Sequence, residues 1–128
     1  MIVIWDNRLS VGDVVLDAEH RRVVSLLNEL DVALTVNAPA VVVEKALEAL
    51  TRAIDSHFQR DAETGRVGEH AALAARAHRL LQDWRCGNHV VDRRSLMTLG
   101  QRWVSHIGRR EIRTSFRLAS IPEHRLAV

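Results

Sequence analysis

The sequence is poor in residues that interrupt helices or crosslink a chain. Its 128 residues include two prolines, six glycines and one cysteine. Because proline and glycine destabilise helix interiors, their scarcity leaves room for long helices. The single cysteine, Cys86, excludes an internal disulfide and favours a reducing compartment, so we predict a cytoplasmic protein.

Aromatic residues are also few, with three Trp, two Phe and no Tyr. Hydrophobic residues still make up 47% of the chain, so we expect a mostly aliphatic core. No window approaches the run of ~18 apolar residues that a membrane span needs. No positive region followed by an apolar stretch opens the chain. The sequence therefore predicts no membrane partner and no signal peptide.

Charge of one sign is not in large excess, since the formal net charge is +2. A group of arginines near the end could contact phosphate: Arg109, Arg110, Arg113 and Arg117. No aromatic platform or base-reading motif accompanies it, so a solvated helix face is the preferred interpretation. We expect no nucleic-acid partner, and binding to an anionic surface is the weakest of three functional hypotheses.

Apolar residues spaced three and four apart predict four helices. The first begins near Asp17, a candidate N-cap, and the second opens after Pro39. The third runs from about residue 69 to 84, and Asp92 caps the fourth. Residues 1–16 read as an irregular or extended arm. Short connections favour an all-α, up-down-up-down four-helix bundle over residues 1–112, followed by a C-terminal tail over 113–128.

Side chains of the kinds that bind metals interrupt the apolar stripes at one end of this bundle. They are His20 near the start of the first helix, His57 and Asp61 near the end of the second, and His106 toward the end of the fourth. His70 and His78, in the first half of the third helix, are expected at the same end of the bundle. Buried imidazoles and carboxylates are unfavourable unless something satisfies them. Their convergence from facing helices indicates a metal site.

Each of these residues has a simpler interpretation when taken alone. A helical histidine is more often hydrogen-bonded and partly buried than a metal ligand, and Asp61 could be a solvated helix end. Several neutral imidazoles with carboxylates suit iron, manganese or zinc. The His-Glu-x-x-His motif of zinc proteases and the Glu-x-x-His pairs of ferritin-like sites are both absent.

A longer pattern extends over residues 5–111. It comprises Trp5, Leu9, Val11-Gly12, Asp17-x-x-His20, Leu27-Asn28, His57-Phe58 and Trp103-x-x-His106-Ile107. In order and spacing it resembles the bacterial hemerythrin family. The resemblance implies a non-heme di-iron centre that reversibly binds O2, or another small diatomic ligand, for storage, delivery or sensing. It implies binding chemistry and not an enzyme.

The resemblance also assigns roles to the candidate ligands. His20 and His57 would bind the iron that accepts O2, and His106 would bind the other iron. Asp61 and Glu111 would bridge the two ions, with the family's usual Glu and Asp exchanged. Glu111 lies five residues after His106, about 140° around a regular helix, so a local π-type turn is needed to bring both to one face.

The third helix departs from the family pattern of two histidines four residues apart. His78 fits the second of them, and Ala74 then occupies the first. Alternatively His70 is the first and Ala74 replaces the second; we prefer His78. This departure motivates the alternative function: a degenerate hemerythrin-like bundle with an incomplete or absent metal site that acts as a protein-interaction or sensory module.

Overall fold

A computed structural model describes residues 1–61, 67–87 and 91–107 of the chain. The side chains of residues 60, 61 and 67–70 lie outside this description, as does the tail predicted over 113–128. Across the described ranges the chain forms helices and no strand. None of these helices combines the length and apolar character that spanning a membrane requires.

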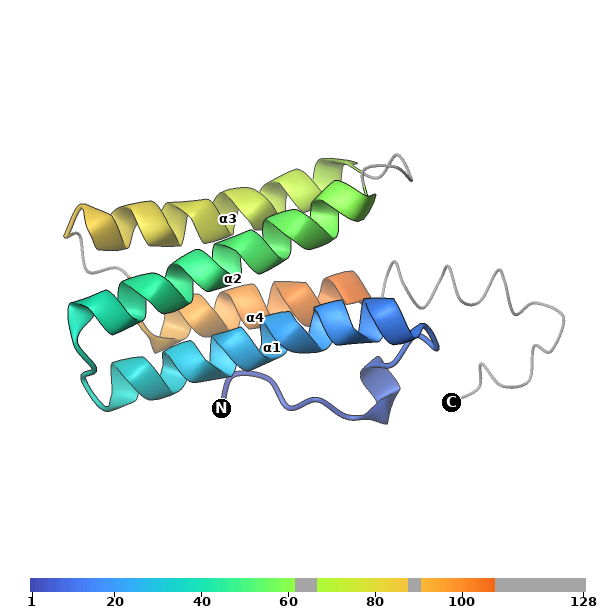
Figure 1. The fold of residues 1–128 in the computed structure, drawn as a ribbon, viewed down its shortest axis with the longest axis horizontal. Helices are drawn as coiled ribbons and strands as arrows, with labels where there is room; N and C mark the ends of the chain where they lie inside the picture. The colour runs from blue at the N-terminus through green and yellow to red at the C-terminus, as the bar shows by residue number, and fades with distance from the viewer. Residues whose placement is uncertain (62–66, 88–90, 108–128) are drawn as a thin grey trace, which may run out of the picture.

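Four long helices follow a short 3-10 turn, η1 (Asn7–Leu9). They are α1 (Val14–Thr35), α2 (Ala40–Asp61), α3 (Val67–Arg85) and α4 (Arg93–His106). The main contacts join α1 to α2 and α4, and α3 to the same two helices. In Figure 1, α1 begins at the end of the molecule where α2 and α4 finish. The all-α class predicted from the sequence is confirmed.

The helix starts follow local side-chain chemistry. Asp92 caps α4 as predicted, because its carboxylate accepts a hydrogen bond of 2.8 Å from the backbone amide of Ser95. The predicted cap of the first helix is wrong. The helix begins at Val14, one turn before Asp17, because Asp13 precedes it and its carboxylate accepts hydrogen bonds from two amides of the first turn.

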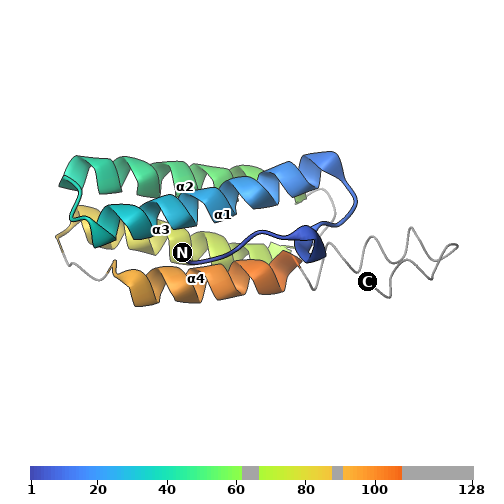
Figure 2. The same cartoon turned by 90° about the horizontal axis from the view of Figure 1, so that it is seen from below.

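Asp17 has a different role, which is to hold the chain that precedes α1. Its carboxylate accepts hydrogen bonds from the Ser10 hydroxyl at 2.6 Å and from the Val11 amide at 2.9 Å. Residues 1–13, called the N-terminal segment below, run along α1 and α4 (Figure 2). Their position is therefore fixed at the end of the molecule where α1 begins.

The other end of the N-terminal segment is held by Asn28 of α1. The Asn28 side-chain oxygen accepts hydrogen bonds from the amides of Ile2 and Val3 at 2.7 and 3.1 Å, and its amide donates to the Val3 carbonyl at 2.8 Å. Gly100 of α4 leaves space for the side chains of Ile2 and Val3. A Cβ atom there would lie 2.7 Å from Ile2 Cγ2, closer than side chains tolerate.

The core between the helices is mostly aliphatic, as the composition predicts. Its fully buried large side chains are Leu27, Leu30, Leu47, Leu50, Ile54, Leu96, Leu99, Ile107 and Trp103. The same core contains three histidines, which are the unusual members of an apolar interior.

Candidate metal centre

Three histidines from three helices meet inside the bundle. His20 of α1, His57 of α2 and His106 of α4 are 0%, 1% and 0% exposed. Each offers a ring nitrogen, and these nitrogens lie within 4.8 Å of one another. Among the described residues, no other group of three or more potential ligands is this compact. We call these three residues the histidine cluster.

The sequence places the histidine cluster in the core through helical periodicity. Each histidine lies three residues from a fully buried side chain of its own helix; these are Val23, Ile54 and Trp103. Positions three apart share a helix face, so each imidazole continues a buried stripe by one turn. The direction of the helices then brings the three turns to the same end of the bundle (Figure 1).

The spacing of two nitrogens matches what one metal ion would require. His57 Nε2 and His106 Nε2 lie 3.2 Å apart. Nitrogens bound to one ion at about 2.0–2.1 Å, with bond angles of about 90–110°, lie roughly 2.9–3.4 Å apart. Two nitrogens on the same ion can be no more than about 4.2 Å apart, so a small closure of the cluster brings all three within reach.

A carboxylate from α1 orients the His57 ring. Glu19 Oε1 lies 2.8 Å from His57 Nδ1, and the Glu19 side chain is 21% exposed. Because a carboxylate accepts hydrogen bonds, we assign the proton to Nδ1, which leaves a lone pair on Nε2. That lone pair points at the cluster. In protein metal sites, a histidine ligand commonly donates its other ring N–H to a carboxylate.

Two aromatic side chains enclose the histidine cluster. The Trp103 ring centre lies 5.7, 5.3 and 5.2 Å from those of His20, His57 and His106. The indole nitrogen of Trp103 donates a 3.3 Å hydrogen bond to the His20 carbonyl, which joins α4 to α1. Phe58 lies 5.3 Å from both His57 and His106. The cluster is therefore shielded from water on these sides.

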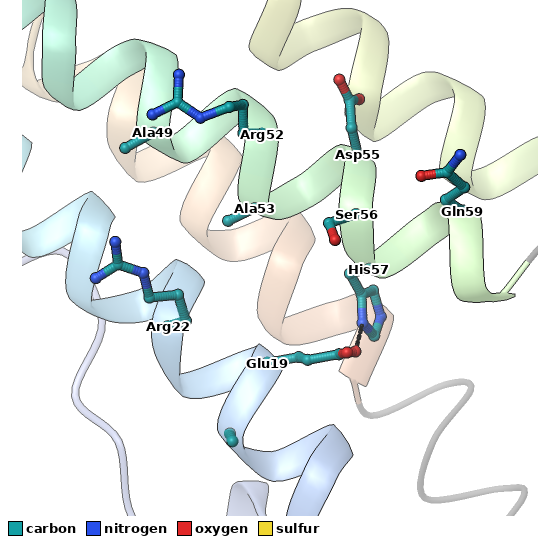
Figure 3. Close-up of a pocket in the computed structure, with 10 residues that line it drawn as sticks. Glu19, Arg22, Ala49, Arg52, Ala53, Asp55, Ser56, His57 and Gln59 are labelled. Carbon is teal, nitrogen blue, oxygen red and sulfur yellow. Dashed lines mark hydrogen bonds and ion pairs between the residues drawn. The ribbon is translucent and has the colours of Figure 1, made fainter.

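One side of the histidine cluster approaches the surface at a groove of about 680 Å³ between α1 and α2. Figure 3 shows His57 at this groove, with Glu19 hydrogen-bonded to it from the facing helix. His57 is the member of the cluster that lines the groove; His20 and His106 do not. Glu19 covers the His57 ring where the two meet.

His78, the preferred third-helix ligand, is not brought to the histidine cluster. Its side chain is 57% exposed and its Nε2 lies 2.8 Å from the Asp55 carboxylate on the α2 surface. The residues of α3 that face the core include Leu73 and Ala77 instead. Ala74, at the position where the resemblance expects a histidine, is partly buried against the core.

The remaining predicted ligands cannot be placed. Asp61 ends α2, but its side chain lies outside the described residues. The side chain of His70 and the whole of Glu111 also lie outside them. The described residues therefore provide ligands for one ion, from His20, His57 and His106.

Glu19 is the site residue that sequence reasoning missed. It precedes His20, and neighbouring positions on a helix point about 100° apart, so no single stripe contains both. Only the rotation of α1 relative to α2 brings Glu19 to His57. The sequence does contain one signal for Glu19, since this carboxylate directly precedes the predicted ligand His20.

Comparisons with protein-family models, curated proteins and solved structures find no match to this chain. The resemblance to bacterial hemerythrins therefore remains a prediction from the motifs and their spacing.

Proposed function

We propose that this chain is a cytoplasmic non-heme iron protein of the hemerythrin type that reversibly binds O2. The proposal includes an up-down-up-down bundle with an N-terminal arm, and a binding role instead of an enzymatic one. His20, His57 and His106 are the proposed protein ligands of one iron. This differs from the resemblance, which assigns His106 to the second iron; the 3.2 Å between His57 Nε2 and His106 Nε2 favours one ion. The second iron of the proposed pair depends on Asp61 and Glu111, whose side chains lie outside the described residues.

The observation that carries the proposal is the convergence of three buried imidazoles with Glu19 behind one of them. Three imidazoles together in one apolar core need an explanation, because histidine is seldom fully buried. A cation supplies one, and neutral imidazoles are good ligands for iron. Glu19 contacts the proposed ligand His57 and contributes a negative charge there. This charge offsets part of the positive charge that an ion would bring into the core.

The chain contributes orientation and a dry surrounding. Glu19 holds the His57 ring with Nε2 directed inward. Trp103 and Phe58 exclude water from the same volume. A ferrous centre with an open coordination position would supply the O2 binding itself, which is the activity that the resemblance implies.

A second function is favoured by the position of His78. A bundle without a third-helix ligand could hold a single ion, or none, and act through protein contacts in a sensory or interaction role. The surface pair between His78 and Asp55 supports this alternative, because it leaves α3 without an imidazole near the histidine cluster among the described side chains.

Anaerobic reconstitution with Fe²⁺ tests the proposal. We expect bound iron after desalting, and an absorption band that appears on exposure to O2 and disappears on its removal. His57→Ala should lower iron affinity at least about 100-fold, because it removes a ligand and the contact with Glu19. One iron per chain with no reversible spectrum would favour the second function, and absence of bound iron would overturn the first.

His78→Gln separates the two possible ligand sets. If His78 stays on the surface with Asp55, the iron content of this variant equals that of the wild type. A loss of one of two irons would instead mean that His78 turns inward when metal binds.

A further inference from the structure

The groove between α1 and α2 differs from an ordinary surface hollow because it ends at a buried residue. His57 is 1% exposed and still lines the groove. Its row on α2 continues through Ala53 and Ala49, which are four and eight residues earlier and share its face. Their small side chains leave the groove open along α2 as far as His57.

The charges along this groove are unevenly distributed. Oxygen-bearing side chains line the groove, with Glu19 next to His57 and Asp55 directed away from it, and two arginines line the part farther from His57 (Figure 3). The oxygen-bearing residues are Glu19, Asp55, Ser56 and Gln59, and the arginines are Arg22 and Arg52. Within the described residues, no ion pair involves either arginine. Their positive charges therefore act directly on the groove.

We propose that this groove is the path by which a divalent metal cation reaches the histidine cluster, an inference that rests on the proposed metal-binding function. Glu19 is the first ligand on this path. Its carboxylate faces both the groove and His57, so a cation that it captures lies beside the His57 ring. Among the described residues, Trp103 and Phe58 cover other sides of the imidazoles, and Glu19 is the polar group between the groove and His57.

The arginines set the rate of this path. A guanidinium near the groove repels an approaching cation and lowers its local concentration. Replacing Arg22 or Arg52 with a carboxylate therefore speeds capture of the cation. Both side chains are exposed, so these changes do not disturb the core.

Stopped-flow mixing with Co²⁺ alone, followed by its visible absorption, measures the effect. We expect Arg22→Glu and Arg52→Glu each to raise the association rate constant about tenfold at low salt. The gain should largely disappear near 1 M salt, where the screening length is about 3 Å. Arg79→Glu makes the same charge change at an exposed position of α3 outside the groove, and should leave the rate within about twofold.

A second variant blocks the path by volume. Ala53→Leu fills the groove one turn from His57 and should slow both association and dissociation of Co²⁺ about tenfold. The affinity and the Co²⁺ spectrum should remain unchanged, because the ligands are the same. Ala75→Leu, at an exposed position of α3, is the matched control. If Ala53→Leu does not fold, the arginine variants decide the matter.

Two failures can be told apart. A wild-type protein that binds no Co²⁺ overturns the proposed metal site and the path together. A protein that binds Co²⁺ with the same rate constants in Arg22→Glu, Arg52→Glu and Arg79→Glu overturns the path alone.

Discussion

Two histidine–carboxylate pairs within the described residues have equal lengths and opposite surroundings. His57 and Glu19 are 2.8 Å apart where α1 meets α2, and His78 and Asp55 are 2.8 Å apart where α2 meets α3. The His57 side chain is 1% exposed and that of His78 is 57% exposed. Distance alone therefore does not distinguish a structural surface pair from part of a candidate site.

The difference lies in what else each imidazole contacts. His57 faces two further imidazoles and two aromatic rings in the buried core. The second nitrogen of His57 is thereby directed to a place where an ion can be held. Exposed pairs are screened by solvent and contribute at most about 1 kcal/mol to stability. Buried pairs have larger effects because water does not replace a lost partner.

Among the changes that would make the two pairs more alike, removal of Trp103 should have the largest effect. The side chain is fully buried, and its loss leaves a cavity beside all three imidazoles. We expect Trp103→Ala to lower the free energy of unfolding by about 3–5 kcal/mol, measured by urea denaturation. Water admitted to the cavity would make the surroundings of His57 more like those of His78.

Trp84→Ala is the matched control for this prediction. Trp84 also donates a 3.3 Å hydrogen bond from its indole nitrogen, to the Ala40 carbonyl, but it is only partly buried. Its loss should cost clearly less than that of Trp103. Equal costs for the two variants would contradict the enclosing role of Trp103.

The two pairs also show how much of the candidate site could be predicted from the sequence. His20, His57 and His106 continue buried stripes, so periodicity together with alternating helix directions predicts their convergence. On α3 the stripe runs through Leu73, Ala77 and Leu80, and His78 lies beside it instead of on it. The family resemblance favoured His78 against this local signal.

Local competition explains the remaining differences from the sequence-based expectations. Asp13 and Asp17 are both suitable N-caps one turn apart, and Asp17 instead bonds Ser10 and Val11. Glu19 depends on how two helices rotate against each other, which spacing within one helix does not encode. The class of fold, by contrast, follows from long apolar periodicity with few helix-breaking residues.

Removing Glu19 should have the next largest effect. Outer carboxylates of this kind change metal affinity by about 10–100-fold, so we expect that loss of Co²⁺ affinity in Glu19→Ala, measured by titration. Glu19→Gln keeps an oxygen that can accept the Nδ1 hydrogen bond and should recover part of the loss and the wild-type Co²⁺ spectrum. A purely structural residue would not show that recovery.

Glu29→Ala and Asp55→Ala are the controls for Glu19. Glu29 is an exposed carboxylate on the same helix, and Asp55 is the carboxylate of the exposed pair. Neither change should alter Co²⁺ affinity by more than about twofold. A loss in Asp55→Ala as large as that in Glu19→Ala would remove the distinction between the two pairs.

Asp31 offers a third comparison, because it is a buried carboxylate whose partners are not histidines. Asp31 of α1 is 5% exposed, and its two oxygens lie 2.9 Å from the Met1 amino group and 3.0 Å from Arg93 Nε. The hydrogen bond from the N-terminal ammonium is the main reason that the pKa of Asp31 falls below its ordinary value of 3.8. Burial opposes this shift and Arg93 adds to it.

Asp31→Asn should therefore have the smallest of these effects, and it should depend on pH. At pH 7 we expect a loss of about 1–2 kcal/mol in the free energy of unfolding, because both partners are partly exposed. A carboxylate whose folded pKa is lowered stabilises fully above its unfolded pKa, 3.8 for Asp31, and loses that contribution as pH falls through the lower folded value. Denaturation curves of wild type and variant should thus converge below about pH 4. Asp55→Asn is the control, and its free energy of unfolding should differ from that of the wild type by under about 1 kcal/mol at pH 7. A difference between wild type and Asp31→Asn that stays constant below about pH 4 would contradict the assigned ion pair.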